Sequence, residues 1–399
     1  MNFHSLNVRK LANIGLLEIL FAMYPMLTVY KYEGFPFSLF ILLVMDIIVY
    51  AKSGYRKSSH YNKIINLLFG FVILHEFLLI FIANVGGEFI SKLIEYCIIF
   101  YSIKTIYPNL DFHKLHNSLN IVAVVCMLGL VYHFVLIQLG QTVYPLTIPF
   151  LPDMAKDSKM YVAILRPTSF FYEPQHYCSF MIIPFFLSLV NKQKIWAVAI
   201  VLSIFLSTSS YGIMVSFIML TIFALFQKSS MLKKFEIVLG VVILGYFLAT
   251  STLFSSGIEK IENTDIERTS RIYNGPTLIS NMPKEDLILG IPYPTVSEYY
   301  FAGKLGSTFL IEKNKNVYLP SFYNIFAKFG IIGIILYLLS YFVHMFKRME
   351  LFILGSALMA GLFSNPDSLG SMYAFYIIFI YHYLHNNNES INYNNPVYK

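Results

Sequence analysis

Long stretches of mostly apolar residues recur along the whole chain, and each is about as long as the 17 to 25 residues that cross a bilayer as a helix. Lipid offers no hydrogen-bond partner for a free backbone N–H or C=O, so such stretches must be helical. Only 13% of the 399 residues are charged, against about 25% in soluble domains. The sequence therefore predicts an all-α polytopic integral membrane protein. We expect about twelve spans, near 11–30, 35–51, 64–83, 89–107, 118–139, 174–190, 195–209, 211–226, 235–254, 321–343, 351–365 and 369–385.

The lysines and arginines are sorted between alternate loops. More than half of the 29 basic residues fall in one set of loops, for example Arg9, Lys52, Lys192 and Lys347. Cytoplasmic loops of membrane proteins carry this excess, so we expect both termini to be cytoplasmic. The net charge of +7 then belongs to membrane loops, and we expect no nucleic-acid partner.

The predicted membrane domain covers residues 1–385, and two longer segments on its outer side interrupt the pattern. One runs over 140–173 and the other over 255–320. Long loops are usually functional or disordered, and these contain aromatic and apolar residues throughout, unlike disordered linkers. We therefore expect two ordered outer loops. The Asn-rich end, 386–399, is predicted to be a disordered cytoplasmic tail.

Several familiar catalytic motifs are absent from the sequence. His75 and Glu76 begin like a zinc-protease motif, but Leu79 stands where the second histidine is needed. There is no Walker A loop, no G-x-S-x-G and no Asp-x-Asp. A nucleotide-driven pump or a metal hydrolase is therefore not predicted, and we expect neither a metal nor another cofactor.

One candidate site lies where the first outer loop enters a membrane helix. Pro167 and Pro174 prevent a regular helix, so Arg166 and Glu173 are expected on irregular backbone at the outer surface. Arginine can bind phosphate oxygens through its planar fork, and a partly desolvated carboxylate can act as a general base. An Arg166–Glu173 salt bridge that only anchors the loop is an equally good interpretation.

The second outer loop contains the sequence Arg268-Thr-Ser-Arg271-Ile-Tyr273 and, further on, Leu-Gly-Ile-Pro-Tyr293. Acids and bases nearly balance in this loop, so Arg268 and Arg271 are either solvated surface charges or specific ligands for an anion. Three tyrosines of the two loops are placed to stack on sugars, namely Tyr172, Tyr273 and Tyr293.

Charged residues inside membrane spans usually face the protein interior or a cavity. Lys92 and Glu95 are three residues apart on one helix, so we expect them to pair with each other. His75 and Glu76 are either structural or line a cavity. Lys328, four residues after Asn324, is a candidate phosphate contact, and His176, close to Glu173, is a candidate acceptor-binding group.

The order of these features resembles the O-antigen polymerase and O-antigen ligase superfamily of bacterial envelopes, and the Wzy-type polymerases in particular. The resemblance covers about residues 160–345. It consists of the outer-loop arginine with Phe-Tyr-Glu-Pro, a Ser-rich step (LSTSSYGIMVS), R-x-x-R-x-Tyr in a large outer loop, a Leu-Gly-Ile-Pro turn and a closing SFYNIFAKFGIIGIILYLLSYF. Ligases often have Ser-Arg at the step, where this chain has Ser210-Tyr211, and a histidine before the closing asparagine, where it has Tyr323. These departures favour a polymerase, with Glu173 as the carboxylate.

The resemblance implies a GT-C-type glycosyltransferase of the bacterial inner membrane with its active site facing the periplasm. Such an enzyme joins oligosaccharide repeats carried on undecaprenyl pyrophosphate, which serves as donor and acceptor, with release of undecaprenyl pyrophosphate. By motif match, Arg166, Arg268 and Arg271 would bind the pyrophosphate and sugars, with membrane lipids and a chain-length-determining co-polymerase as partners. The alternatives are an O-antigen ligase that transfers glycan to lipid A core and, in a different class, a lipid-linked oligosaccharide flippase or exporter. Flippases typically have short outer loops, which distinguishes them from this chain.

Overall fold

The computed structural model describes residues 14–32, 35–53, 62–82, 87–149, 151, 166–226, 231–232, 234–236, 239–240, 243, 270–306, 317–363 and 369–393. Within these ranges the fold is all-α, as predicted, apart from one short antiparallel pair of strands, β1 (Lys31–Tyr32) and β2 (Phe35–Pro36). The predicted span at 235–254 lies almost wholly outside the described residues, and each of the other predicted spans overlaps helical residues.

The first half of the chain forms α2 (Leu16–Met23), the 3₁₀ helix η1 (Tyr24–Val29), α3 (Phe37–Ser53), α4 (Asn62–Ile82), α5 (Gly87–Ile106), η2 (Tyr107–Asn109), α6 (Phe112–Gln138), α7 (Pro174–Val190), α8 (Lys194–Leu206) and α9 (Ser210–Phe226). The second half forms α12 (Ser270–Asn281), α13 (Lys284–Leu289), α14 (Val296–Phe301), α15 (Ser321–Phe342), η6 (Met345–Lys347), α16 (Met349–Leu362) and α17 (Ser371–Tyr393).

Three helical segments among the described residues are long and apolar enough to cross a membrane: Lys63–Phe81, Phe112–Gln138 and Ser321–Phe342. Shorter apolar helices accompany them at Leu16–Thr28, Pro174–Val190, Lys194–Leu206, Ser210–Phe226 and Glu350–Leu362. These lengths and compositions make a membrane location plausible. The number of twelve spans stays a prediction.

The last helix runs further than the sequence indicates. α17 continues to Tyr393, well into the segment that we predicted to be a disordered tail. No glycine or proline occurs between Ser371 and Pro396, so no residue with a strong helix-breaking effect ends the helix at His385. Residues 394–399 lie outside the described part of the chain.

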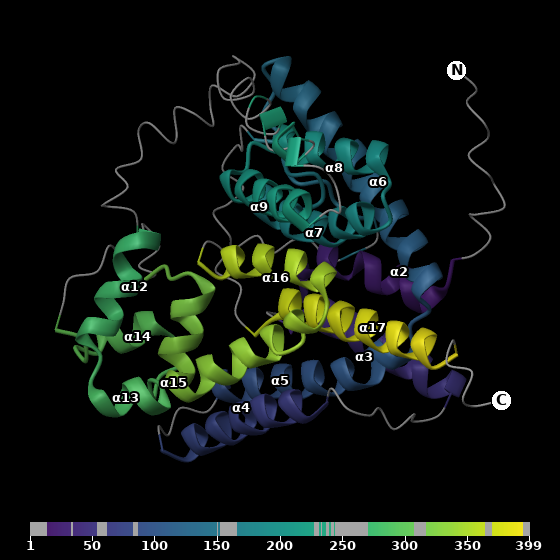
Figure 1. The fold of residues 1–399 in the computed structure, drawn as a ribbon. Coiled ribbons are helices and arrows are strands. Elements are labelled where there is room, and N and C mark those ends of the chain that lie inside the picture. The colour runs from purple at the N-terminus through teal and green to yellow at the C-terminus, as the bar shows by residue number, and fades with distance from the viewer. Residues whose placement is uncertain are drawn as a thin grey trace, which may run out of the picture.

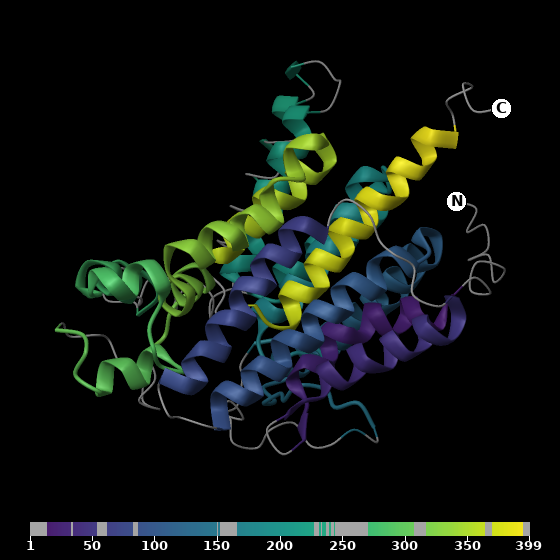
Figure 2. The same ribbon diagram turned by 90° about the horizontal axis from the view of Figure 1, so that it is seen from below.

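The helices pack in layers around α17 (Figures 1 and 2). In Figure 1, α7, α8 and α9 lie on one side of α16 and α17, and α3, α4 and α5 lie on the other. Every side chain from Met372 to Leu384 is buried, so α17 is enclosed by protein along most of its length. A hydrogen bond of 2.8 Å between the hydroxyls of Ser38 and Ser371 links it to α3.

The short helices α12, α13 and α14 gather at one end of the molecule, beside the first half of α15 (Figure 1). α13 crosses α15 so closely that only glycine fits. Gly330 interrupts α15 with φ 63° and ψ −166°, and a Cβ there would lie 2.2 Å from the carbonyl oxygen of Ile288. Gly290 has φ 94°, and a Cβ there would lie 2.1 Å from the carbonyl oxygen of Lys328. Positive φ and this close backbone approach both require a residue without a side chain.

Candidate functional site

The end of the first outer loop folds against α6. The Nδ1 atom of His133 accepts hydrogen bonds from the backbone N–H groups of Ser169 (3.2 Å) and Thr168 (3.4 Å). The Ser169 hydroxyl donates to the carbonyl of Cys126 (2.8 Å). Because these groups are buried, each bond satisfies a polar atom that would otherwise be costly. The segment that carries Arg166 and Glu173 is therefore held in one place.

Arg166 is bound to the Ser-rich step between α8 and α9. Its Nε donates to the Thr208 hydroxyl (3.2 Å), and its Nη2 donates to the Thr208 carbonyl (2.7 Å). Thr208 has φ 54°, in the left-handed region that residues with side chains rarely adopt. The structure thus joins two motifs that the sequence separates, and Thr208 is a functional candidate that sequence reasoning missed.

The rest of the Ser-rich step is tied together by its own hydroxyls. Ser207 donates to the carbonyl of Ile204 (2.6 Å) and lies 3.2 Å from the sulfur of Cys178 on α7. The Ser209 hydroxyl accepts from the N–H of Gly212 (3.3 Å), at the start of α9. Serine hydroxyls commonly bond to nearby backbone in this way, which explains why the step is rich in serine and still buried.

Glu173 is the N-cap residue of α7. Its backbone is extended (φ −133°, ψ 152°), Pro174 occupies the first helical position, and its side chain makes no capping bond. In the described part of the chain its carboxylate forms no ion pair with Arg166, so a salt bridge between the two does not anchor the loop. A half-buried carboxylate at the positive end of a helix remains available to a substrate.

Tyr172 and His176 lie on either side of Glu173, and both are half-buried. Tyr172 packs against the hydrophobic core, and His176 occupies the first turn of α7, where its N–H donates to the carbonyl of Glu173 (3.0 Å). The structure therefore places Tyr172, Glu173 and His176 at the start of α7, and Arg166 at the step between α8 and α9.

The residues predicted in the second outer loop form a separate group. Arg268 lies outside the described residues, and Arg271 lies in the first turn of α12 with its side chain outside them. Tyr273, also on α12, is 41% exposed. The ring of Tyr293 packs edge-on against that of Tyr299, with centroids 5.3 Å apart.

Tyr299 couples α14 to α13. Its hydroxyl donates to the carboxylate of Asp286. Burial and this bond to a carboxylate raise the pKa of Tyr299 above its usual value, because both disfavour the phenolate. Tyr293 therefore packs against a neutral tyrosine, Tyr299, whose hydroxyl is hydrogen-bonded to Asp286.

The closing motif packs against α12. Tyr323 is so close to Gly275 that a Cβ there would lie 2.4 Å from its ring, and the Asn274 amide donates to the carbonyl of Tyr318 (3.2 Å). The half-buried Asn324 lies in the first turn of α15. The structure therefore brings the helix of Arg271 and Tyr273 to the helix of Asn324.

A tyrosine-lined cavity of about 30 Å³ lies between the start of α9 and the start of α15. Tyr211, directly after the Ser-rich step, and Ser321, the first residue of α15, both line it. The remaining lining is mostly aromatic, including Tyr337, Tyr373 and Tyr376. The start of α9 and the start of α15 thus face one internal space.

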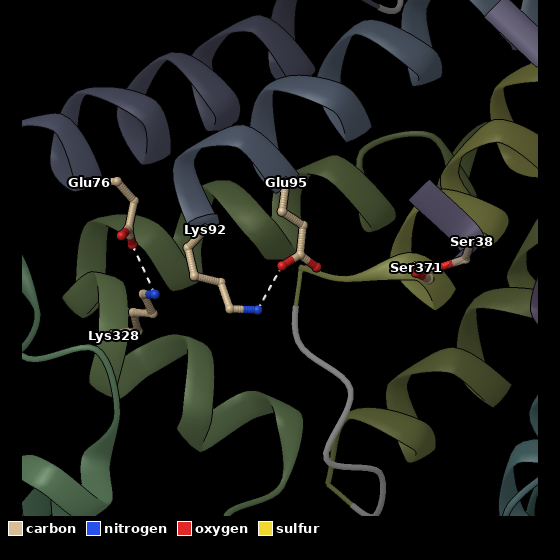
Figure 3. Close-up of polar contacts among 6 residues, drawn as sticks. All are labelled: Ser38, Glu76, Lys92, Glu95, Lys328 and Ser371. Carbon is tan, nitrogen blue, oxygen red and sulfur yellow. Dashed lines mark hydrogen bonds and ion pairs between the residues drawn. The ribbon is translucent and has the colours of Figure 1, made fainter. Parts of the chain in front are cut away.

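Lys328 belongs to a cluster of four charges from three helices (Figure 3). Its Nζ lies 3.0 Å from Oε1 of Glu76, which is fully buried. Lys92 donates to Glu95 (2.7 Å), which confirms the predicted pairing. Lys92 also lies close enough to Glu76 to interact with it electrostatically. Lys328 is therefore an ion-paired residue, and the Glu76–Lys328 pair was not predicted.

The chain matches no model of a known protein family, and no curated protein matches it either.

Proposed function

We propose that this protein is a polysaccharide polymerase of the O-antigen polymerase type. In this role it is a membrane glycosyltransferase that transfers a growing glycan from undecaprenyl pyrophosphate onto an incoming lipid-linked repeat. Its place is the bacterial inner membrane with the site facing the periplasm. Membrane lipids and a chain-length-determining co-polymerase are the further partners of this proposal.

The observation that carries the proposal is the contact between Arg166 and Thr208. The first outer loop and the Ser-rich step are separate elements of the motif order, and a two-pronged guanidinium contact joins them. Glu173 lies a few residues from Arg166 with a carboxylate that caps no helix. A cation for the leaving pyrophosphate and a carboxylate for the acceptor proton are what glycosyl transfer from a pyrophosphate requires.

The proposed reaction is a displacement at the anomeric carbon of the donor glycan. The acceptor hydroxyl forms the new C–O bond while the bond from that carbon to the pyrophosphate oxygen breaks. Glu173 takes the hydroxyl proton, and undecaprenyl pyrophosphate leaves with the electron pair. Arg166 and Arg271, with Arg268, stabilise the charge that develops on it, and each charge-assisted hydrogen bond contributes roughly 1.5–3 kcal/mol.

The remaining candidates bind and orient the sugars. Tyr172, Tyr273 and Tyr293 offer aromatic faces for stacking, and His176 and Asn324 offer hydrogen bonds to hydroxyls. Lys328 is already paired with Glu76. If it also binds phosphate, its ammonium group interacts with both the Glu76 carboxylate and the phosphate. Holding donor and acceptor in line adds a large entropic advantage.

Deleting the gene tests the proposal directly, and the readout is the length of the surface glycan. We expect lipopolysaccharide with a single repeat unit on its core, because a ligase still attaches single units. A bare core without any repeat would contradict the polymerase assignment and favour a ligase or a flippase.

Complementing that strain with Glu173→Gln tests the proposed base. We expect loss of polymer with normal amounts of protein in the membrane, because the amide keeps the shape and cannot take a proton. Glu285→Gln is the matched control, since Glu285 is an exposed carboxylate at the start of α13. If both variants make polymer of normal length, Glu173 is not the base.

A further inference from the structure

The short helix α13 is charged at its start and apolar at its end. Its first turn consists of Lys284, Glu285 and Asp286. Its last two residues, Ile288 and Leu289, have exposed fractions of 52% and 57%. Exposed aliphatic side chains alone are common on protein surfaces, so what these two face has to be inferred from where the end of α13 lies.

The end of α13 lies beside α4, below the outer end of that helix. The imidazole of His75, on α4, hydrogen-bonds to the backbone of Leu289. The apolar segment of α4 runs from Lys63 to Phe81, and its length of about 28 Å matches the hydrocarbon core of a bilayer. His75 precedes Phe81 by six residues, which is about 9 Å along the helix axis. Because helical side chains tilt toward the N-terminus of their helix, the imidazole points further from the outer end, and Leu289 lies at the level of the outer leaflet.

The residues of α4 around this level are themselves lipid-facing. Leu74 and Leu78, on either side of His75 in the sequence, are both exposed, and exposed leucines of a helix that crosses a bilayer contact acyl chains. Leu78 is closer to the outer end of α4 than His75 is. The exposed end of α13 therefore lies at a depth at which α4 already faces lipid, at the end of the molecule where α12, α13 and α14 gather (Figure 1).

The turn after α13 meets the requirement that a bilayer places on irregular backbone. Such backbone is tolerated at membrane depth only where protein satisfies its polar groups. The N–H of Gly290 donates to the carbonyl of Asp286 (2.8 Å), and the N–H of Ile291 donates to the carbonyl of Ala327 (2.9 Å). Pro292 has no N–H. The turn therefore presents no free backbone donor to lipid.

We propose that α13 and the Leu-Gly-Ile-Pro turn form a re-entrant element in the outer leaflet, with Ile288 and Leu289 in contact with the acyl chains of membrane lipids. The charged start of α13, with Lys284 and Glu285, stays at the level of the lipid headgroups. Part of the predicted outer loop at 255–320 thus enters the bilayer and anchors the preceding helix α12 at the membrane surface. The proposal does not depend on the polymerase assignment.

Spin labels test this proposal in the full-length protein, reconstituted into phosphatidylcholine vesicles. The label is attached at Ile288→Cys or Leu289→Cys in a Cys97→Ser background, because Cys97 is exposed. Power-saturation EPR compares collisions of the label with oxygen, which concentrates in lipid, and with a nickel chelate, which stays in water. We expect the oxygen-to-nickel collision ratio at both positions to match that of Leu78→Cys on α4. It should exceed several-fold the ratio at Lys304→Cys, which is exposed in the same outer loop.

Three results would overturn the proposal. A ratio at Leu289→Cys as low as that at Lys304→Cys would place the end of α13 in water. Few collisions with either reagent would show that protein, and not lipid, covers Leu289. A low ratio at Leu78→Cys would show that α4 itself does not face lipid. Both α13 side chains are more than half exposed, so the variants should fold, and an unchanged melting temperature checks this. The length of the surface glycan tests the polymerase assignment separately.

Discussion

Thr208 combines an uncommon backbone conformation with two hydrogen bonds to Arg166. It adopts a left-handed backbone conformation, which costs a residue with a side chain of order 1–3 kcal/mol. Arg166 stabilises this conformation through the hydroxyl and the carbonyl of the same residue. The guanidinium is thereby oriented by the step between α8 and α9. Such pre-organisation is what an anion-binding arginine requires.

Two substitutions of Arg166 should distinguish the effect of its positive charge from the effect of its planar shape. We expect Arg166→Ala to abolish polymer and Arg166→Lys to reduce it at least tenfold, because an ammonium cannot reproduce the planar fork. Gel analysis of glycan length, with membrane levels of protein measured in parallel, checks both. Lys304→Ala, an exposed cation in the second loop, should leave the polymer unchanged. Polymer of normal length in the Arg166→Ala strain would remove this residue from the site.

Residue patterns could predict only part of the site. The prolines around Arg166 and Glu173 mark the irregular segment, and the three-residue spacing predicts the Lys92–Glu95 pair. Nothing in the sequence indicates that Arg166 binds Thr208, because many polar side chains border an outer loop. Which of these polar groups Arg166 binds is decided by how the helices pack.

At the scale of elements, the ion pair between Glu76 and Lys328 fastens α4 to α15. Glu76 is fully buried, and the side chain of Lys328 is 12% exposed. Aromatic rings surround the ammonium, with the centroids of Tyr96 and Phe329 at 5.6 and 5.7 Å. A buried pair is costly to form, and removing one partner leaves the other charge uncompensated.

Single and double replacements of this pair should therefore differ sharply. We expect Glu76→Leu or Lys328→Met alone to lower the free energy of unfolding by about 3–5 kcal/mol, and the two together by much less. Lys92→Gln should cost less than about 1 kcal/mol, because that pair is half-exposed. Unfolding in mixed detergent micelles measures all four variants. Equal losses in single and double variants would show that the two charges are not coupled.

The elements themselves were largely predictable, since long apolar stretches have no alternative to the helix in lipid. The pairing of Glu76 with Lys328, in contrast, could not be predicted from the sequence. Several intramembrane charges lie on different helices, and the sequence does not indicate which of them meet. The sequence also does not indicate that α17 extends to Tyr393, because an Asn-rich composition is typical of disorder even where no residue in it breaks a helix.

At the scale of the whole molecule, the two ends of the bundle differ in character. One end gathers α12, α13 and α14 (Figure 2), and the other has a cavity of about 470 Å³ formed by the start of α2, the end of α3, the turn from η2 into α6 and α17. Four chain segments that the lysine pattern places on the cytoplasmic side meet at that cavity. The fold is thus consistent with the orientation expected from charge alone.

Cysteine labelling can test this orientation. A membrane-impermeant maleimide should label Tyr273→Cys in intact spheroplasts, because Tyr273 is exposed on α12. Lys52→Cys should be labelled only after the membrane is opened. Cys97 is exposed and must be replaced by serine, whereas Cys126 and Cys178 are buried. The reverse labelling pattern would invert the topology and place the candidate site on the cytoplasmic side.

The break at Gly330 divides α15 into two halves that have different neighbours. Its first half is tied to α13 through the hydrogen bond from Ile291 N–H to the carbonyl of Ala327 (2.9 Å) and packs against α12. Its second half packs within the bundle. Lys328 lies two residues before the break, on the half of α15 that contacts α13. A force that moves α12 or α13 would therefore act on the ion pair between Lys328 and Glu76 before it reaches the second half of α15.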